Sequence, residues 1–344
     1  MGERAGLLET QRLAFLKEDC GRQLQAVLME VAKSPQVVTK LSNIVSCFES
    51  VEGGLRILIG FCLLQVIGEQ PRTDVLSELL DLSFDTFSKL RKDETLRQIV
   101  DVQSGIANFR SPVIARAVLN GLSQASVITE IVSECIKRGH QARYADPYLG
   151  TISIELMRFA NLERILPEGK GKRPALQNLY EDLKSVLTIR ETPLFWLQYA
   201  MARISLGDLG IARRYFEQSY SYAKKIKGFD TFQIDNHYCR LLLSEAEAAT
   251  NPDEAFKAVD EALTTLKRQV LRESRHYPYR SAWSLEGVAK RHGSKWTDEQ
   301  RKVVVGASKY LIYASQRLKP DVARSIAVIG GLQRLNIVVD ILSD

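Results

Sequence analysis

The sequence contains none of the short motifs that usually mark an active site. Within its 344 residues there is no Walker A phosphate loop, GxSxG elbow, HExxH zinc motif or GxGxxG dinucleotide fingerprint. The stretch PEGKGKRP (residues 167–174) has glycines and lysines, but the phosphate-loop order is missing, and we interpret it as a polar linker. No nucleophile or acid–base pair stands out elsewhere. We therefore expect no catalytic residues, no cofactor and no enzyme activity.

Histidine and cysteine are scarce and scattered, which argues against a metal centre. The histidines have no second histidine or cysteine at ligand spacing; they are His140, His237, His276 and His292. The cysteines form no CxxC pair; they are Cys20, Cys47, Cys62, Cys135 and Cys239. An odd, dispersed set is typical of reduced, packed thiols in a cytosolic protein. We expect no metal site, and we place Cys62 and Cys239 in the core.

Long apolar runs are also absent. The longest that we identify, LRILIGFCLLQVIG at residues 55–68, is too short to span a bilayer and includes Arg56 and Gln65. It predicts a buried helix. No apolar segment follows the charges of the first eleven residues, and Gly6 stands where a myristoylation signal needs serine or threonine. We expect a cytoplasmic protein that does not bind membranes.

Charge is unevenly distributed along the chain. Residues 1–125 hold 14 basic and 15 acidic side chains, whereas residues 126–344 hold the other 33 basic and 26 acidic ones. Phosphate binding needs a locally basic surface. The first part of the chain is therefore a poor candidate for binding nucleic acid.

Helical spacing dominates the sequence, with one exception. In LRQIVDVQSGIANFRSP (residues 96–112), β-branched and apolar residues alternate on either side of Ser104-Gly105, which is typical of a hairpin. Ser111-Pro112 then begins another helix. Three helices followed by a short hairpin is the order of a winged-helix domain, which we predict over residues 51–122. The segment before it, residues 1–50, is predicted to be helical.

The second part of the chain carries a repeat signal. Small and large residues alternate at Trp196, Ala200, Gly207-Asp208, Ala212, Phe216 and Ser219, which resembles a tetratricopeptide repeat. A weaker copy follows at Cys239, Leu243, Ala255, Val259 and Ala262. We therefore predict a mainly α fold, in which a winged-helix module is followed by a tetratricopeptide-like array over residues 123–344.

This order of parts resembles STAND-type P-loop NTPases, a class that includes many bacterial defence and signalling proteins. The stretch CGRQLQAVLMEVAKSPQVVTKL is similar to the helical lid that follows their nucleotide-binding core, and GIANFRSPVIARAVL is similar to the end of their winged helix. The helical array corresponds to their C-terminal sensor region. The chain has no counterpart of the ATP-binding residues. The resemblance implies the regulatory and sensing half of such a system.

We therefore expect a non-catalytic module that recognises a protein, such as a P-loop NTPase, an effector chain or a trigger protein. Aromatic and basic side chains at repeat positions, together with the basic and aromatic stretch at residues 266–283, suggest the contact surface. The candidate partner-binding residues are Trp196, Tyr199, Arg203, Tyr222, Arg272, Arg275, Tyr277 and Arg280. For Trp196, a place in the core is the alternative.

A nucleic-acid-binding regulator is the other hypothesis. In that case residues 83–97 would be a recognition helix whose contacts are Lys89, Arg91, Lys92 and Arg97. Asp85, Asp93 and Glu94 interrupt these basic residues, which weakens an electrostatic footprint. The interleaved aromatic and basic residues near Arg275 could serve nucleic acid in the same way, by phosphate pairing and base stacking.

Overall fold

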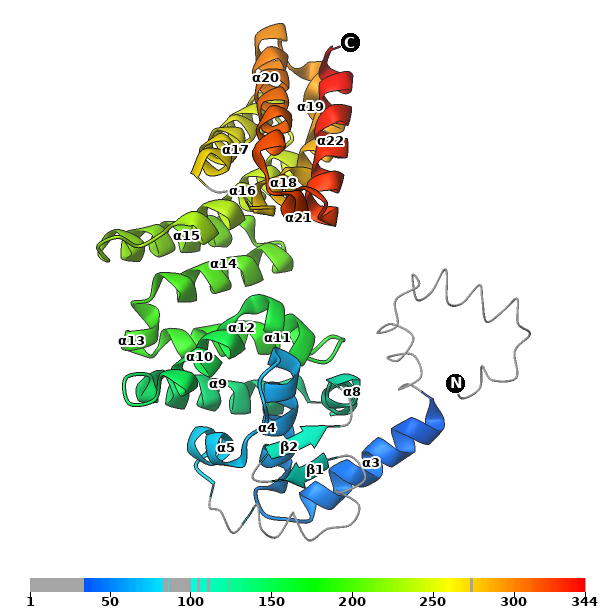
Figure 1. Ribbon diagram of the computed structural model, residues 1–344, viewed down its shortest axis with the longest axis vertical. Coiled ribbons are helices and arrows are strands. Elements are labelled where there is room, and N and C mark those ends of the chain that lie inside the picture. The colour runs from blue at the N-terminus through cyan, green and yellow to red at the C-terminus, as the bar shows by residue number, and fades with distance from the viewer. Residues whose placement is uncertain are drawn as a thin grey trace, which may run out of the picture. The chain divides into compact units, whose positions relative to one another are not determined.

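The computed structural model describes residues 34–82, 86, 100–103, 106–109, 112–122, 124–272 and 275–343. The described chain is mainly helical, as predicted (Figure 1). It divides into two compact units, residues 1–190 and residues 191–344. Most of the predicted N-terminal segment, residues 1–33, lies outside the described residues.

The first unit is built around α4 (Gly54–Ile67), which confirms the buried helix predicted over residues 55–68. This helix is apolar on every side, so its neighbours cover most of its length. Gly60 lets α5 approach closely, since a Cβ at this position would lie 2.8 Å from the Leu76 side chain. The helices around it are α3 (Pro35–Glu49), α5 (Thr73–Leu80), α8 (Pro112–Gly121), α9 (Ala125–Ala142), α10 (Pro147–Met157) and α11 (Phe159–Ile165).

Two short strands lie between α5 and α8 in the chain. Strand β1 (Val100–Gln103) pairs antiparallel with β2 (Ile106–Phe109), and the register places Val100 opposite Phe109. Residues 104 and 105, where we predict the turn, lie outside the described residues. The same holds for residues 87–99, which include every basic residue of the predicted recognition helix.

The chain divides after Arg190 and not at the predicted boundary between residues 122 and 123. Helix α9 belongs to the first unit because it packs on α4, α5 and α10, and Gly139 lies so close to α10 that a Cβ there would be 2.7 Å from the Leu149 carbonyl. The predicted polar linker at residues 167–174 is in part helical. Its second half forms the start of α12 (Lys172–Lys184), which precedes α13 (Leu187–Arg190).

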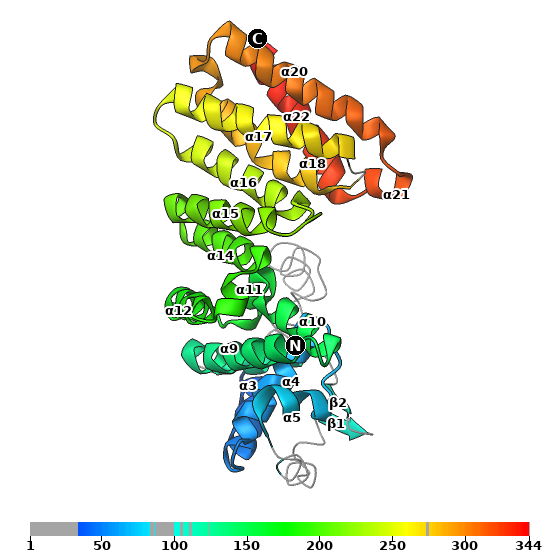
Figure 2. The ribbon, with the colours of Figure 1, turned by 90° about the vertical axis from the view of Figure 1, so that its left-hand side faces the viewer.

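The second unit consists of helices, many of which pack as antiparallel pairs, and Figure 2 shows α16, α17 and α20 side by side. Pairs are formed by α14 with α15, α16 with α17, and α20 with α22. Its α-helices are α14 (Pro193–Leu206), α15 (Leu209–Lys224), α16 (Phe232–Ala248), α17 (Pro252–Arg272), α18 (Tyr277–Ser281), α19 (Leu285–His292), α20 (Asp298–Ala314), α21 (Pro320–Ala323) and α22 (Ile326–Ser343). Three short 3₁₀ turns join them: η2 (Ala282–Ser284), η3 (Gly293–Lys295) and η4 (Ser315–Arg317).

The small and large residues of the predicted repeats meet inside these pairs. Ala200 of α14 and Ala212 and Phe216 of α15 are fully buried in one cluster. Gly207 ends α14 with φ +84°, a conformation that glycine adopts without strain. The Ser219 hydroxyl donates to the Pro193 carbonyl at 2.8 Å, so this buried polar group has a hydrogen-bond partner. The weaker copy is buried between α16 and α17 at Cys239, Leu243, Ala255, Val259 and Ala262.

Two adjacent glycines set the position of the last helix. A Cβ at Gly331 would lie 2.5 Å from the Tyr279 carbonyl of α18, and one at Gly330 would lie 2.8 Å from the Trp283 ring. The Trp283 indole also donates to the Ala327 carbonyl of α22 at 3.0 Å. Helix α22 therefore packs directly on the α18 segment.

Among the described helices, α22 alone has the length and apolarity of a membrane span. Within the second unit, Val328, Leu335 and Val338 of this helix are buried against its neighbours. Ile326 and Ile329 stay exposed. Our sequence analysis considered only residues 55–68 for this role and did not single out α22.

Candidate functional site

The predicted contact residues of α14 are turned into the protein. Trp196, Tyr199 and Arg203 are all buried. The Trp196 ring lies 5.2 Å from that of Tyr215 and stacks on that of Tyr222 at 6.5 Å, measured between centroids. The expectation that these three residues contact a partner is therefore wrong, and the core alternative for Trp196 is the one observed.

Arg203 is buried because its charge is met within the same unit. Its guanidinium donates to the Tyr199 hydroxyl at 2.7 Å and to the Asp208 carboxylate at 3.0 Å. The hydrogen bond from Arg203 couples Tyr199 to the turn between α14 and α15, where Asp208 lies. Buried charges need such partners. The basic and aromatic character of this helix pair therefore serves the fold. Tyr222 is half-buried against Trp196.

The remaining predicted contacts lie on the surface. All four are exposed: Arg272 ends α17, Arg275 lies between the two helices, and Tyr277 and Arg280 are on α18. Between residues 264 and 283 the sequence has five basic residues and one acidic residue. The Arg275 guanidinium lies 5.5 Å from the Phe232 ring centroid, and the Tyr277 ring packs against Phe232 at 6.3 Å. These four residues define what we call the α17–α18 face.

A small cavity opens beside the α17–α18 face, between the start of α16 and the last turns of α17. Its volume is about 200 Å³. The residues that line it are Asp230, Phe232, Asp235, Arg268, Gln269 and Arg272. We call it the Gln269 cavity. Our sequence analysis did not find it, because Gln269 is an ordinary helix residue in sequence and its partners come from another helix.

Asp235 fixes the charge of the cavity wall. Its side chain is 6% exposed and accepts hydrogen bonds from the Tyr220 hydroxyl at 2.7 Å and the Thr231 hydroxyl at 3.2 Å. Arg268 lies 3.5 Å from the same carboxylate. Burial, and secondarily the Asp235 charge, raise the pKa of Tyr220 well above its ordinary value, so the phenol remains a donor. The Asp235 carboxylate thus receives its hydrogen bonds from side chains of the protein.

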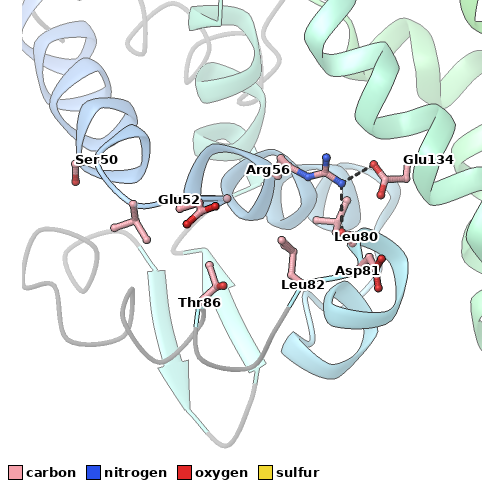
Figure 3. Close-up of a pocket in the computed structure, with 10 residues that line it drawn as sticks. Ser50, Glu52, Arg56, Leu80, Asp81, Leu82, Thr86 and Glu134 are labelled. Carbon is pink, nitrogen blue, oxygen red and sulfur yellow. Dashed lines mark hydrogen bonds and ion pairs between the residues drawn. The ribbon is translucent and has the colours of Figure 1, made fainter.

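The first unit has a larger and more open cavity of about 920 Å³ next to α4, α5 and α9 (Figure 3). Charged side chains line it, but several of them already pair. Arg56 binds Glu134 at 2.5 Å and the Leu80 carbonyl at 3.2 Å, and Asp81 binds Arg138 at 2.7 Å. Asp81 ends α5 with φ +52°, which is unusual for a residue other than glycine. This network ties α4, α5 and α9 together.

Within the described residues, no group of three or more histidine, cysteine, aspartate or glutamate side chains could hold a metal ion. Cys62, Cys135 and Cys239 are buried free thiols, as predicted for Cys62 and Cys239. Burial raises the pKa of the Cys135 thiol to about 12. A thiol with so high a pKa is a poor nucleophile at neutral pH.

Comparisons with known proteins give no family assignment. No protein-family model matches the chain, and neither a curated protein nor a solved structure matches it significantly. The STAND resemblance therefore remains a hypothesis based on the order of its parts and on two short stretches.

Proposed function

We propose that this chain is a non-catalytic recognition module, and that its second unit binds a protein partner through the α17–α18 face. The observation that carries the proposal is the contrast in exposure between two sets of predicted contacts. The basic and aromatic residues of α14 are buried, whereas Arg272, Arg275, Tyr277 and Arg280 stay exposed beside a cavity. Arginine and tyrosine are the residue types that most often dominate the energy of protein interfaces.

The proposal includes a place in a cellular system. The element order α3, α4, α5, β1, β2 and α8 supports a winged-helix module, and the helix pairs α14–α15 and α16–α17 support a tetratricopeptide-like array. Both are expected in the regulatory half of a STAND-type NTPase-like defence or signalling system. The partner would be a P-loop NTPase, an effector chain or a trigger protein, and binding would take place in the cytoplasm.

The test is affinity purification of the full chain from its native host at low salt, with and without nuclease. Three baits are compared: the native chain, Arg272→Glu with Arg275→Glu, and Arg214→Glu with Lys302→Glu. The last bait is the matched control, because it makes the same change of charge at exposed positions on α15 and α20. We expect one stoichiometric protein that survives nuclease, is retained by the control and is lost with the Arg272/Arg275 variant.

Two outcomes would contradict the proposal. A partner that is retained equally by all three baits would place its binding site elsewhere on the chain. Nucleic acid that is lost at modest salt, with no stoichiometric protein, would favour the nucleic-acid alternative, because phosphate contacts weaken steeply with salt. Substitution of Lys89 and Arg91, which lie outside the described residues, would then be the next step.

A further inference from the structure

Gln269, which lines the cavity, has a buried polar atom without a hydrogen-bond partner. The Gln269 side chain is 2% exposed, and its Nε2 donates to the Phe232 carbonyl at 3.2 Å. Because a carbonyl can only accept, this bond fixes the orientation of the amide and turns Oε1 away from Phe232. No hydrogen bond reaches that Oε1. Buried oxygens of this kind nearly always have a donor in native proteins, so the geometry calls for an N–H or O–H from outside.

The mouth of the cavity has guanidinium groups that can pair with a carboxylate. Arg268 and Arg272 line it, and the Arg268 side chain is 58% exposed although it approaches Asp235. Arg275 adds a further positive charge nearby, above Phe232. Guanidinium groups bind carboxylates through paired hydrogen bonds. The carboxylates of Asp230 and Asp235 line the same cavity and repel an anion that enters deeply. The ligand's own carboxylate therefore belongs near Arg272, and its hydrogen-bond donor belongs inside, at Gln269.

An acidic peptide segment meets both requirements. Its backbone N–H can donate to Gln269 Oε1, while the side chain of a neighbouring aspartate or glutamate pairs with Arg272 and Arg268. A phosphodiester fits less well, because it has no hydrogen to donate to Gln269 Oε1.

We propose that the Gln269 cavity binds an acidic peptide segment, with a backbone N–H of the segment on Gln269 Oε1 and a carboxylate of the segment on Arg272. The inference rests on the proposed function, and it specifies the chemistry that the α17–α18 face recognises in its partner.

The test is a selection from random nonapeptides displayed on phage, carried out in parallel on the full native chain and on Gln269→Met. Methionine keeps the length of the side chain but offers no amide. Peptides enriched on the native chain are then synthesised, and their affinities are measured by calorimetry. We expect an aspartate or glutamate in the enriched sequences and binding about tenfold weaker to Gln269→Met. Replacing the acid in the peptide by its amide should weaken binding about as much.

Two further variants complete the design. Gln233→Met is the matched control, because it makes the same chemical change at an exposed position of α16; its affinity should equal that of the native chain. Arg272→Ser lies at an exposed position, so it tests the carboxylate contact even if Gln269→Met folds poorly. We expect it to weaken binding of the acidic peptide about fivefold.

Several results would overturn the proposal: no enrichment on the native chain over Gln269→Met, enriched peptides without an acid, or equal affinity for the native chain and Arg272→Ser. The proposed function stands apart from these outcomes. If a purified partner still depends on Arg272 and Arg275 but binds Gln269→Met normally, the cavity assignment fails and the α17–α18 face remains. If no partner depends on the face at all, the proposed function fails.

Discussion

Helix α14 and the α17–α18 face have similar residue types and opposite exposure. Both combine aromatic rings with arginines, and in sequence both read as contact surfaces. In α14 the rings stack on α15 and Arg203 is held by Tyr199 and Asp208, whereas at the end of α17 the arginines remain exposed. The comparison shows that composition identifies residues with a capacity for binding. Whether these residues form contacts within the fold or stay exposed depends on which element packs against them.

The substitution with the largest expected effect on stability is Trp196→Ala. Removing a buried indole leaves a cavity next to Tyr215 and Tyr222, so we expect the free energy of unfolding to fall by about 3–5 kcal/mol. Urea unfolding followed by circular dichroism measures it. Trp196→Phe, which keeps an aromatic ring, should lose clearly less. A Trp196→Ala variant as stable as the native chain would mean that the side chain is exposed and available as a contact after all.

A smaller loss is expected for Arg203→Met. The substitution keeps the aliphatic stem but removes the donors to Tyr199 and Asp208, which should lower the free energy of unfolding by about 1–3 kcal/mol. The control is Arg214→Met on the exposed side of α15, where we expect a change of no more than about 0.5 kcal/mol. Equal effects of the two variants would contradict the structural role assigned to Arg203.

The dependence of stability on pH tests the burial of His237 on α16, the helix that packs against both α15 and α17. Burial, and secondarily Arg240, lower the pKa of His237 from 6.5 to about 4. The unfolded chain therefore takes up the proton first as the pH falls. Stability is complete above pH 6.5 and should fall between pH 6.5 and 4, by at most about 1.4 kcal/mol per pH unit from this residue.

The measurement is the free energy of unfolding in urea at pH 7, 6 and 5, for the native chain and for His237→Gln. The variant should show a shallower decline, but some decline should remain, because burial also lowers the pKa of His140 and His292. Identical slopes for the two proteins would place the His237 imidazole in water.

The smallest effect on stability is expected on the exposed side of the comparison. Replacing Arg272 and Arg275 together by serine should change the free energy of unfolding by less than about 0.5 kcal/mol. The same unfolding assay measures it, with Arg214→Ser and Lys302→Ser as the control. A loss as large as that of Arg203→Met would show that these arginines support the fold, and the contrast with α14 would disappear.

The sequence predicted the helical class, the buried α4 and the small residues between paired helices, because each depends on local spacing. It did not predict the division after Arg190, which depends on how closely α9 approaches α10 at Gly139. Trp196 and Arg203 were misassigned for a related reason, since their partners are chosen by tertiary contact. The Gln269 cavity needs Asp235 and Gln269 from separate helices, and no spacing within one helix indicates that meeting.

The glycine pair of α22 has a consequence for the orientation of the α17–α18 face. Gly331 lies against the Tyr279 carbonyl, so a side chain there would require α18 to move, and a side chain at Gly330 would require the Trp283 ring to move. Tyr277 and Arg280 lie on that same short helix. The direction in which Tyr277 and Arg280 face therefore depends on how α22, a helix distant in sequence, packs on α18. Substitutions in α22 can thus change the orientation of Tyr277 and Arg280 while every residue of the α17–α18 face stays the same.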